Sequence, residues 1–91
     1  MIEKKAKICN EQGIHCRPAS VILKEMREYD GEIHILSDNG EAKLLSVMSL
    51  LGLGLDKGRE ITIRVDGPNE EEVGKRLVDL FEYNYDFPPR E

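Results

Sequence analysis

The chain has 91 residues, 40% of them hydrophobic and 34% charged, which predicts one globular domain over 1–91 without long disordered tracts. Its formal net charge of −5 disfavours non-specific binding of nucleic acid or of an anionic membrane. The longest apolar stretch, at 44–55, is shorter than the roughly 18 residues of a membrane span, and MIEKKAKICN does not read as a secretory signal, so we expect a cytoplasmic protein without membrane insertion.

The first predicted elements are a strand at 2–8 and an amphipathic helix at about 16–29. In the strand, apolar residues alternate with lysines, which is the period of a half-buried strand. In the helix, apolar residues recur at intervals of three and four. Pro18 lacks an amide hydrogen and is tolerated only in a first turn, so the helix must begin within a residue or two of His15. The Asp-Gly pair at 30–31 ends it.

A hairpin and a short helix follow. Strands at 32–37 and about 41–44 are joined by a tight turn, for which the Asn-Gly pair at 39–40 is a strong signal. Ser46 is then placed to cap the free amides of a second helix, which glycines at 52 and 54 would end.

A strand at 59–65 and a final helix complete the chain, before a tail at 84–91 that we expect to fray. Asn69, with Glu72 three residues later, resembles a capping pair at the start of that helix. The buried face of the helix is marked by Val73, Leu77, Leu80 and Phe81. The order βαββαβα, with strands apolar on one face only, predicts an α/β fold of the α+β type, a two-layer sandwich with its helices on one side of the sheet.

A histidine and an arginine flank the predicted start of the first helix. There the first amides lack intrahelical partners and the helix dipole is positive, which favours a neutral imidazole at His15 and an anion attached to it. Arg17 adds a planar guanidinium suited to phosphate oxygens. This pattern is typical of a site that stabilises a phosphoryl group carried on a histidine nitrogen. Spacing alone leaves open a plain capping histidine beside a surface arginine.

An apolar patch rimmed by basic residues is predicted near the same helix start. Val47, Met48 and Leu51 would form the patch, with Lys24 and Arg27 as its rim, and such a surface suits an acidic, partly apolar partner. Periodicity equally allows the three apolar residues to belong to the core. The leucines expected in the core are Leu44, Leu50 and Leu53.

Three stretches of the chain resemble the HPr family, the histidine-containing phosphocarriers of the bacterial phosphoenolpyruvate:sugar phosphotransferase system. These stretches are N-x-x-G-I-H-C-R-P-A-S at 10–20, L-L-S-V-M-S-L-L-G-L-G at 44–54 and K-G-R-E-I-T-I-R-V-D-G at 57–67. The resemblance implies an open-faced sandwich, in which three helices cover one face of a four-stranded antiparallel sheet.

The same resemblance implies a function for the helix start. His15 would accept a phosphoryl group on Nδ1 from phosphorylated enzyme I and pass it to sugar-specific IIA domains, while Arg17 steadies the phosphoryl oxygens. The protein would then be a carrier, not an enzyme, with no metal or other cofactor, and a monomer by default.

The resemblance also implies regulation and a partner surface. Ser46 corresponds to the serine that HPr kinase/phosphorylase modifies in Gram-positive bacteria, although Leu45 stands where those relatives usually have lysine. A phosphate at this helix cap would repel an acidic partner. The expected partner-binding residues are Ile14, Cys16, Ser20, Lys24, Arg27, Val47, Met48 and Leu51.

Three other functions are weighed against the carrier. A regulatory module that docks on a transcriptional regulator according to its Ser46 state is the main alternative, but His15 argues against it. A thiol nucleophile at Cys16 lacks an orienting third group. A metal site would need Cys9, His15, Cys16 and His34 as ligands, and these residues lack any recognised ligand spacing. We expect both cysteines to remain free thiols in a reducing compartment and His34 to be an exposed strand residue.

Overall fold

Seven elements follow one another in the predicted order βαββαβα in a computed structural model that describes residues 1–9, 13–14 and 16–83. They are β1 (Ile2–Lys7), α1 (Cys16–Met26), β2 (Glu32–Ser37), β3 (Gly40–Lys43), α2 (Val47–Leu51), β4 (Glu60–Asp66) and α3 (Glu70–Glu82). The tail at 84–91, which the sequence predicts to fray, lies outside the described residues. None of the described helices has the length and apolar character that crossing a bilayer demands.

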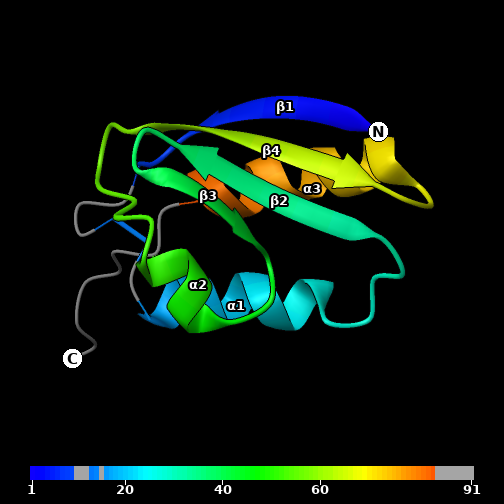
Figure 1. The fold of residues 1–91 in the computed structure, drawn as a ribbon, viewed down its shortest axis with the longest axis horizontal. Helices are drawn as coiled ribbons and strands as arrows, with labels where there is room; N and C mark the ends of the chain where they lie inside the picture. Colours follow the sequence, from blue (N-terminus) through cyan, green and yellow to red (C-terminus); the bar gives the residue numbers. More distant parts are fainter. Residues whose placement is uncertain (10–12, 15, 84–91) are drawn as a thin grey trace.

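The four strands form one antiparallel sheet in the order β1-β4-β2-β3 (Figure 1). The central strand β4 explains this order, because it is the one with the most regular alternation of apolar and polar residues. Its Ile61, Ile63 and Val65 are buried while the residues between them stay partly exposed. Both neighbours align their apolar residues with this row, for example Ile35 opposite Ile63. One face of the sheet is therefore apolar and the other polar, as predicted.

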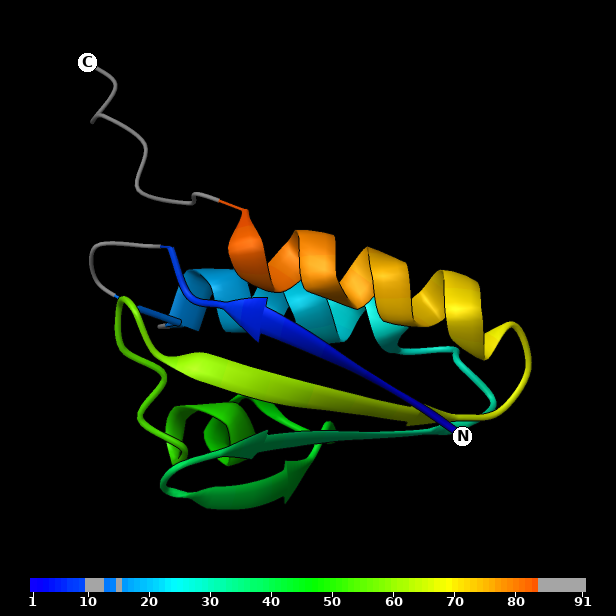
Figure 2. The ribbon, with the colours of Figure 1, turned by 90° about the horizontal axis from the view of Figure 1, so that it is seen from above.

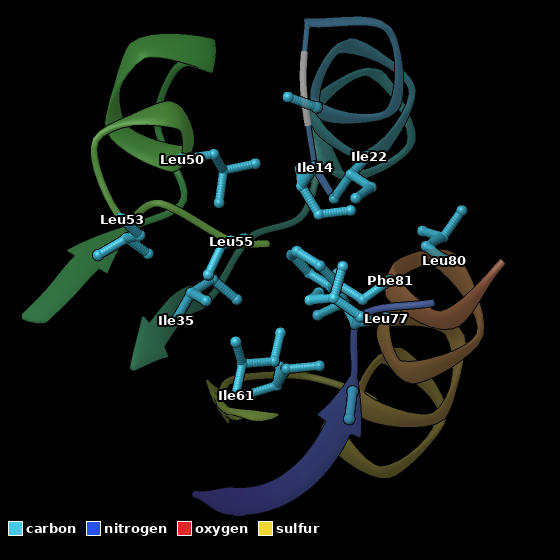
Figure 3. Close-up of a cluster of buried hydrophobic side chains, with 14 of the residues drawn as sticks. Ile14, Ile22, Ile35, Leu50, Leu53, Leu55, Ile61, Leu77, Leu80 and Phe81 are labelled. Carbon is cyan, nitrogen blue, oxygen red and sulfur yellow. The ribbon is translucent and has the colours of Figure 1, made fainter. Parts of the chain in front are cut away.

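The helices cover the apolar face, with α1 and α2 beside each other and α3 behind β1 and β4 (Figures 1 and 2). Between the layers lies one core, to which every element except β3 contributes a buried side chain, while Ala42 of β3 packs against its edge (Figure 3). Leu50 and Leu53 lie in this core as expected, whereas Leu44 is half-buried against its edge. The open-faced sandwich that the sequence predicts is thus confirmed.

Helix α1 ends at Met26, three residues before the predicted end. Its last turn tightens, because the Arg27 amide bonds to the carbonyl of Lys24 and the Tyr29 amide to the carbonyl of Met26. Tyr29 leaves the helix and donates a hydrogen bond from its hydroxyl to the Pro68 carbonyl, at 2.7 Å. This bond ties the end of α1 to the turn before α3.

The hairpin turn falls one residue earlier than the Asn-Gly signal predicts. Ser37 pairs with Gly40, so the loop is Asp38 and Asn39, and β3 begins at Gly40. The side-chain amide of Asn39 donates to the Leu53 carbonyl at 2.9 Å, and its backbone amide donates to Ser37 Oγ at 3.2 Å. These bonds hold Asn39 in the loop, and the positive φ of 138° is taken by Gly40.

The capping pair predicted for α3 is wrong. Asn69 adopts the left-handed conformation, with φ 51°, and its side chain makes no capping bond. Glu70, the first helical residue, instead bonds to the chain outside the helix: it accepts a hydrogen bond from the Gly67 amide at 3.3 Å and another from the Met1 ammonium group at 3.1 Å. The first helical turn is acidic throughout, which suits the positive end of the dipole.

Candidate functional site

The candidate phosphoryl site lies where α1 begins. The helix starts at Cys16, as Pro18 predicts, and Pro18 is fully buried in the first turn. His15 lies outside the described residues, so the geometry of the site is that of its two flanks.

The flank before His15 is anchored to the loop between α2 and β4. The amide of Ile14 donates to the Leu55 carbonyl at 2.8 Å. Gly13 has φ +71°, and a Cβ on it would lie 2.3 Å from that same carbonyl oxygen. Only glycine fits both the conformation and the close approach. The chain therefore reaches the start of α1 from a buried support.

Ile14 was expected to bind a partner, and the structure contradicts this. Its side chain is only 5% exposed and points into the core beside Ile22 (Figure 3). The physical reason is the bond to Leu55, which turns the residue inward. Ile14 therefore supports the start of α1 from the core side.

The flank after His15 is the N-terminus of α1. Its first turn holds no acidic residue that would offset the positive end of the helix dipole. Arg17 is exposed, and no described carboxylate pairs with it. The first amides of a helix and a guanidinium that no described carboxylate neutralises together suit an anion bound beside His15. Of the neighbouring Cys16, the structure places only the backbone.

Ser46 caps α2, as predicted. Its Oγ accepts a hydrogen bond from the Ser49 amide at 3.2 Å, and its own amide donates to Ser49 Oγ at 3.3 Å. This reciprocal pair is a capping box, here with serine in the third helical position. Ser49 Oγ also lies 3.1 Å from the Lys43 carbonyl oxygen. Ser46 is exposed and held at the end of the link between β3 and α2.

The apolar residues of α2 differ in their exposure. Met48 is 75% exposed, whereas Val47 and Leu51 are half-buried, with Val47 packed against the core. Leu45, which the sequence-based surface omitted, is 72% exposed. It stands within an apolar run, and no periodic signal distinguishes it from its buried neighbours.

A groove of about 600 Å³ lies between the second half of α1 and the link from β3 to α2. It brings together four of the predicted surface residues, Ser20, Lys24, Arg27 and Val47, and adds Leu45. Arg17, Met48 and Leu51 do not line it. The predicted surface is therefore divided: part of it lines this groove, while the exposed Met48 and the half-buried Leu51 lie outside the groove lining.

His34 is less exposed than predicted and lies on the opposite, polar face of the sheet. Its side chain is 28% exposed, with Nδ1 3.1 Å from a carboxylate oxygen of Glu41 and Nε2 3.5 Å from one of Glu32. The hydrogen bond from His34, followed by the charge of Lys43, lowers the pKa of Glu32. The two carboxylates flank the ring on opposite sides and do not converge on one point.

Of the remaining candidate ligands, the structure describes the side chain of Cys9. Cys9 is an exposed free thiol whose Sγ lies 3.5 Å from the Lys7 carbonyl oxygen. Within the described residues no group of three or more His, Cys, Asp or Glu side chains is placed to hold a metal ion.

Comparison with known proteins yields one family and a consistent set of relatives. The family described as "PTS HPr component phosphorylation site" matches residues 2–83. The phosphocarrier protein HPr of Vibrio cholerae is 38% identical over 82 residues, covering 90% of this chain and 96% of that protein. The phosphocarrier protein NPr of Escherichia coli K12 is 36% identical over 86 residues, covering 93% and 96%.

Solved structures agree with these relatives. HPr-C-His from Thermoanaerobacter tengcongensis has a TM-score of 0.81 at 32% identity, covering 89% of this chain and 91% of that one. The phosphocarrier protein HPr from Bacillus anthracis has a TM-score of 0.82 at 25% identity, covering 89% and 96%. Sequence and fold therefore point to the same family.

Proposed function

The chain belongs to the HPr family of phosphotransferase-system phosphocarriers, and we propose that it accepts a phosphoryl group on His15 from phosphorylated enzyme I and donates it to IIA domains. The observation that carries this proposal is the start of α1 directly after His15, anchored by the bond from Ile14 to Leu55 and followed by Arg17, with which no described carboxylate pairs.

The proposed transfer needs positioning and charge stabilisation more than acid–base chemistry. Nδ1 of neutral His15 attacks the phosphorus of the donor's phosphohistidine in line, so one N–P bond forms while the donor's N–P bond breaks. The charge on the transferred oxygens is met by the first amides of α1 and by Arg17. The reverse sequence, with an IIA histidine as acceptor, unloads the carrier.

Intact mass measurement tests this proposal directly. With phosphoenolpyruvate, magnesium and enzyme I, the protein should gain one acid-labile phosphoryl group. His15→Ala should abolish the gain, and Arg17→Ala should slow it. His34→Ala and Arg76→Ala serve as matched controls on other surfaces and should behave as wild type. An adduct that persists in His15→Ala would contradict the proposal.

The acceptor branch is tested with the same protein. Relatives named HPr and NPr match this chain at nearly equal identity. The phosphorylated carrier should therefore be offered IIA domains of both the sugar and the nitrogen type, and the ratio of the two transfer rates identifies the branch it serves.

Regulation at Ser46 is a second candidate function, favoured by its exposed position between the exposed Leu45 and Met48. A phosphate there adds about 1.5 to 2 negative charges at a helix start, which the fold tolerates and an acidic partner does not. Incubation with ATP and HPr kinase should yield an acid-stable adduct that is lost in Ser46→Ala and retained in Ser49→Ala. No adduct, or one that survives in Ser46→Ala, excludes this regulation.

A further inference from the structure

The two flanks of α1 and of the turn that follows it carry opposite charges. Lys24 and Arg27, three residues apart, line the groove on the side of the link from β3 to α2. Glu25 and Glu28 have the same spacing one residue later, and one residue turns a helix by about 100°. These two glutamates lie on the other flank, toward α3. The acidic flank is therefore a different surface from the groove beside α2.

A second groove, of about 350 Å³, lies between this acidic flank and α3. Its apolar lining comes from Met26 and Tyr29 at the end of α1 and from Val73 on α3, and all three side chains are half-buried. Figure 2 shows the two helices side by side and running in opposite directions, so the groove lies where α1 ends and α3 begins. Because α1 has 11 residues, about 15 Å of helix separates this groove from the helix start beside His15.

The ring of Tyr29 is held in place in this groove. Its hydroxyl donates to the Pro68 carbonyl at 2.7 Å. Two glycines leave room for the ring: a Cβ on Gly31 would lie 2.6 Å from its Cε2, and a Cβ on Gly67 would lie 2.8 Å from its hydroxyl oxygen. The aromatic part of the lining is therefore presented in one arrangement, which lowers the entropic cost of binding a partner.

The rim of the second groove is acidic. Three glutamates and one arginine line it, which is a net charge of −2. Glu25 accepts a hydrogen bond from Arg76 Nε at 3.2 Å, and this pair bridges the two helices. Glu28 and Glu72 are exposed, and no described cation pairs with either one. Carboxylates around an apolar lining are complementary to a basic, amphipathic surface.

We propose that the groove between α1 and α3 docks a basic amphipathic helix of a partner protein. One apolar side chain of that helix enters the groove over Met26 and Val73, and arginine or lysine side chains beside it pair with Glu28 and Glu72. Because the groove lies at the far end of α1, the docked partner leaves His15 accessible. This surface is additional to the one through which a carrier exchanges its phosphoryl group.

A synthetic helical peptide with leucines along one face and arginines on both flanks tests the proposal. Titrated into the isotopically labelled full chain at about 0.05 M salt, it should first shift the amide resonances of Met26 and Val73. Glu28→Gln/Glu72→Gln should raise the Kd of the peptide about fivefold, as expected for the loss of two exposed ion pairs. Resonance shifts confined to other surfaces would overturn the proposal.

A matched control removes the same charge from another surface. Glu41→Gln/Glu60→Gln acts on two exposed glutamates of the polar face of the sheet and should leave the Kd unchanged. Equal losses of affinity in the two double variants would show only a general attraction to an acidic protein and would overturn the proposal. Peptides with serine in place of leucine, or glutamate in place of arginine, should not bind. Binding of either one at the original Kd would also overturn it.

Two further outcomes would assign the groove differently. Saturating peptide should leave the initial rate of phosphoryl uptake from enzyme I unchanged, and inhibition of uptake would place the peptide at the start of α1 and refute docking at its end. A dimer in sedimentation that Glu28→Gln/Glu72→Gln converts to monomer would give the groove to a second copy of this chain. The titration requires no phosphoryl transfer, so a failure of the carrier function would leave its result unaffected.

Discussion

Replacing Gly13 with alanine is expected to cost far more stability than the same change at Gly58. Both glycines have positive φ, +71° and +86°, so each substitution incurs the left-handed penalty of about 1–2 kcal/mol for a residue with a Cβ. At Gly58 no atom lies within 4 Å of the new Cβ. At Gly13 the Cβ would lie 2.3 Å from the Leu55 carbonyl oxygen, and backbone must move to relieve the contact.

That movement should also weaken the bond from Ile14 to the same carbonyl, whose net contribution is about 0.5–1.5 kcal/mol. The total for Gly13→Ala is therefore about 1.5–3.5 kcal/mol, against about 1–2 for Gly58→Ala. Urea denaturation measures both, with an unchanged m-value showing that only stability differs. Equal losses in the two variants would refute the argument that close approach to Leu55 makes glycine necessary before His15.

Two further predictions concern the helix starts. The pKa of the Met1 ammonium group is raised above 8.0, chiefly by its hydrogen bond with Glu70, and that same bond chiefly lowers the pKa of Glu70 below 4.5. The ion pair between these two groups should therefore contribute fully to the free energy of unfolding between pH 4.5 and pH 8.0. This contribution should be lost as the pH rises through the raised pKa of the ammonium group, and also as the pH falls through the lowered pKa of Glu70. Thermal melts measured across pH should show both losses of stability, and both should be smaller in Glu70→Gln. If both losses persist in that variant, other groups are responsible for them. At α2, Ser46→Ala should cost about 1 kcal/mol while Ser46→Asp keeps the cap. Urea midpoints that fall equally for both would show that the hydroxyl acts by some means other than accepting the Ser49 amide.

The order of elements follows from local patterns that can be read without any neighbour. Alternation in β4 predicts a strand with one buried face, and Pro18 places the start of α1 within a residue or two of His15. Ser46 caps α2 because a hydroxyl one residue before a helix reaches the third amide whatever lies around it. These are interactions within a few residues, so the sequence contains both partners.

The misplaced features all depend on partners that are distant in the chain. At the start of α3, Glu70 makes side-chain hydrogen bonds where Asn69 was expected to, because Met1 lies beside Glu70 in the fold. Tyr29 leaves α1 because Pro68 is within reach of its hydroxyl. The two residues of each pair are far apart in the sequence, so a local pattern cannot reveal their contact.

The candidate site shows the same division. His15 and Arg17 lie on either side of Cys16, the first residue of α1, so the sequence by itself brings together the two residues to which we assign the phosphoryl group. Ile14 and Leu45 are both apolar and each lies two residues before a helix, yet Ile14 is 5% exposed and Leu45 is 72% exposed. Only the tertiary structure separates them. The bond to Leu55 turns Ile14 into the core, while the link after β3 holds Leu45 outside it, because burial is decided by what packs against a residue and not by its hydrophobicity.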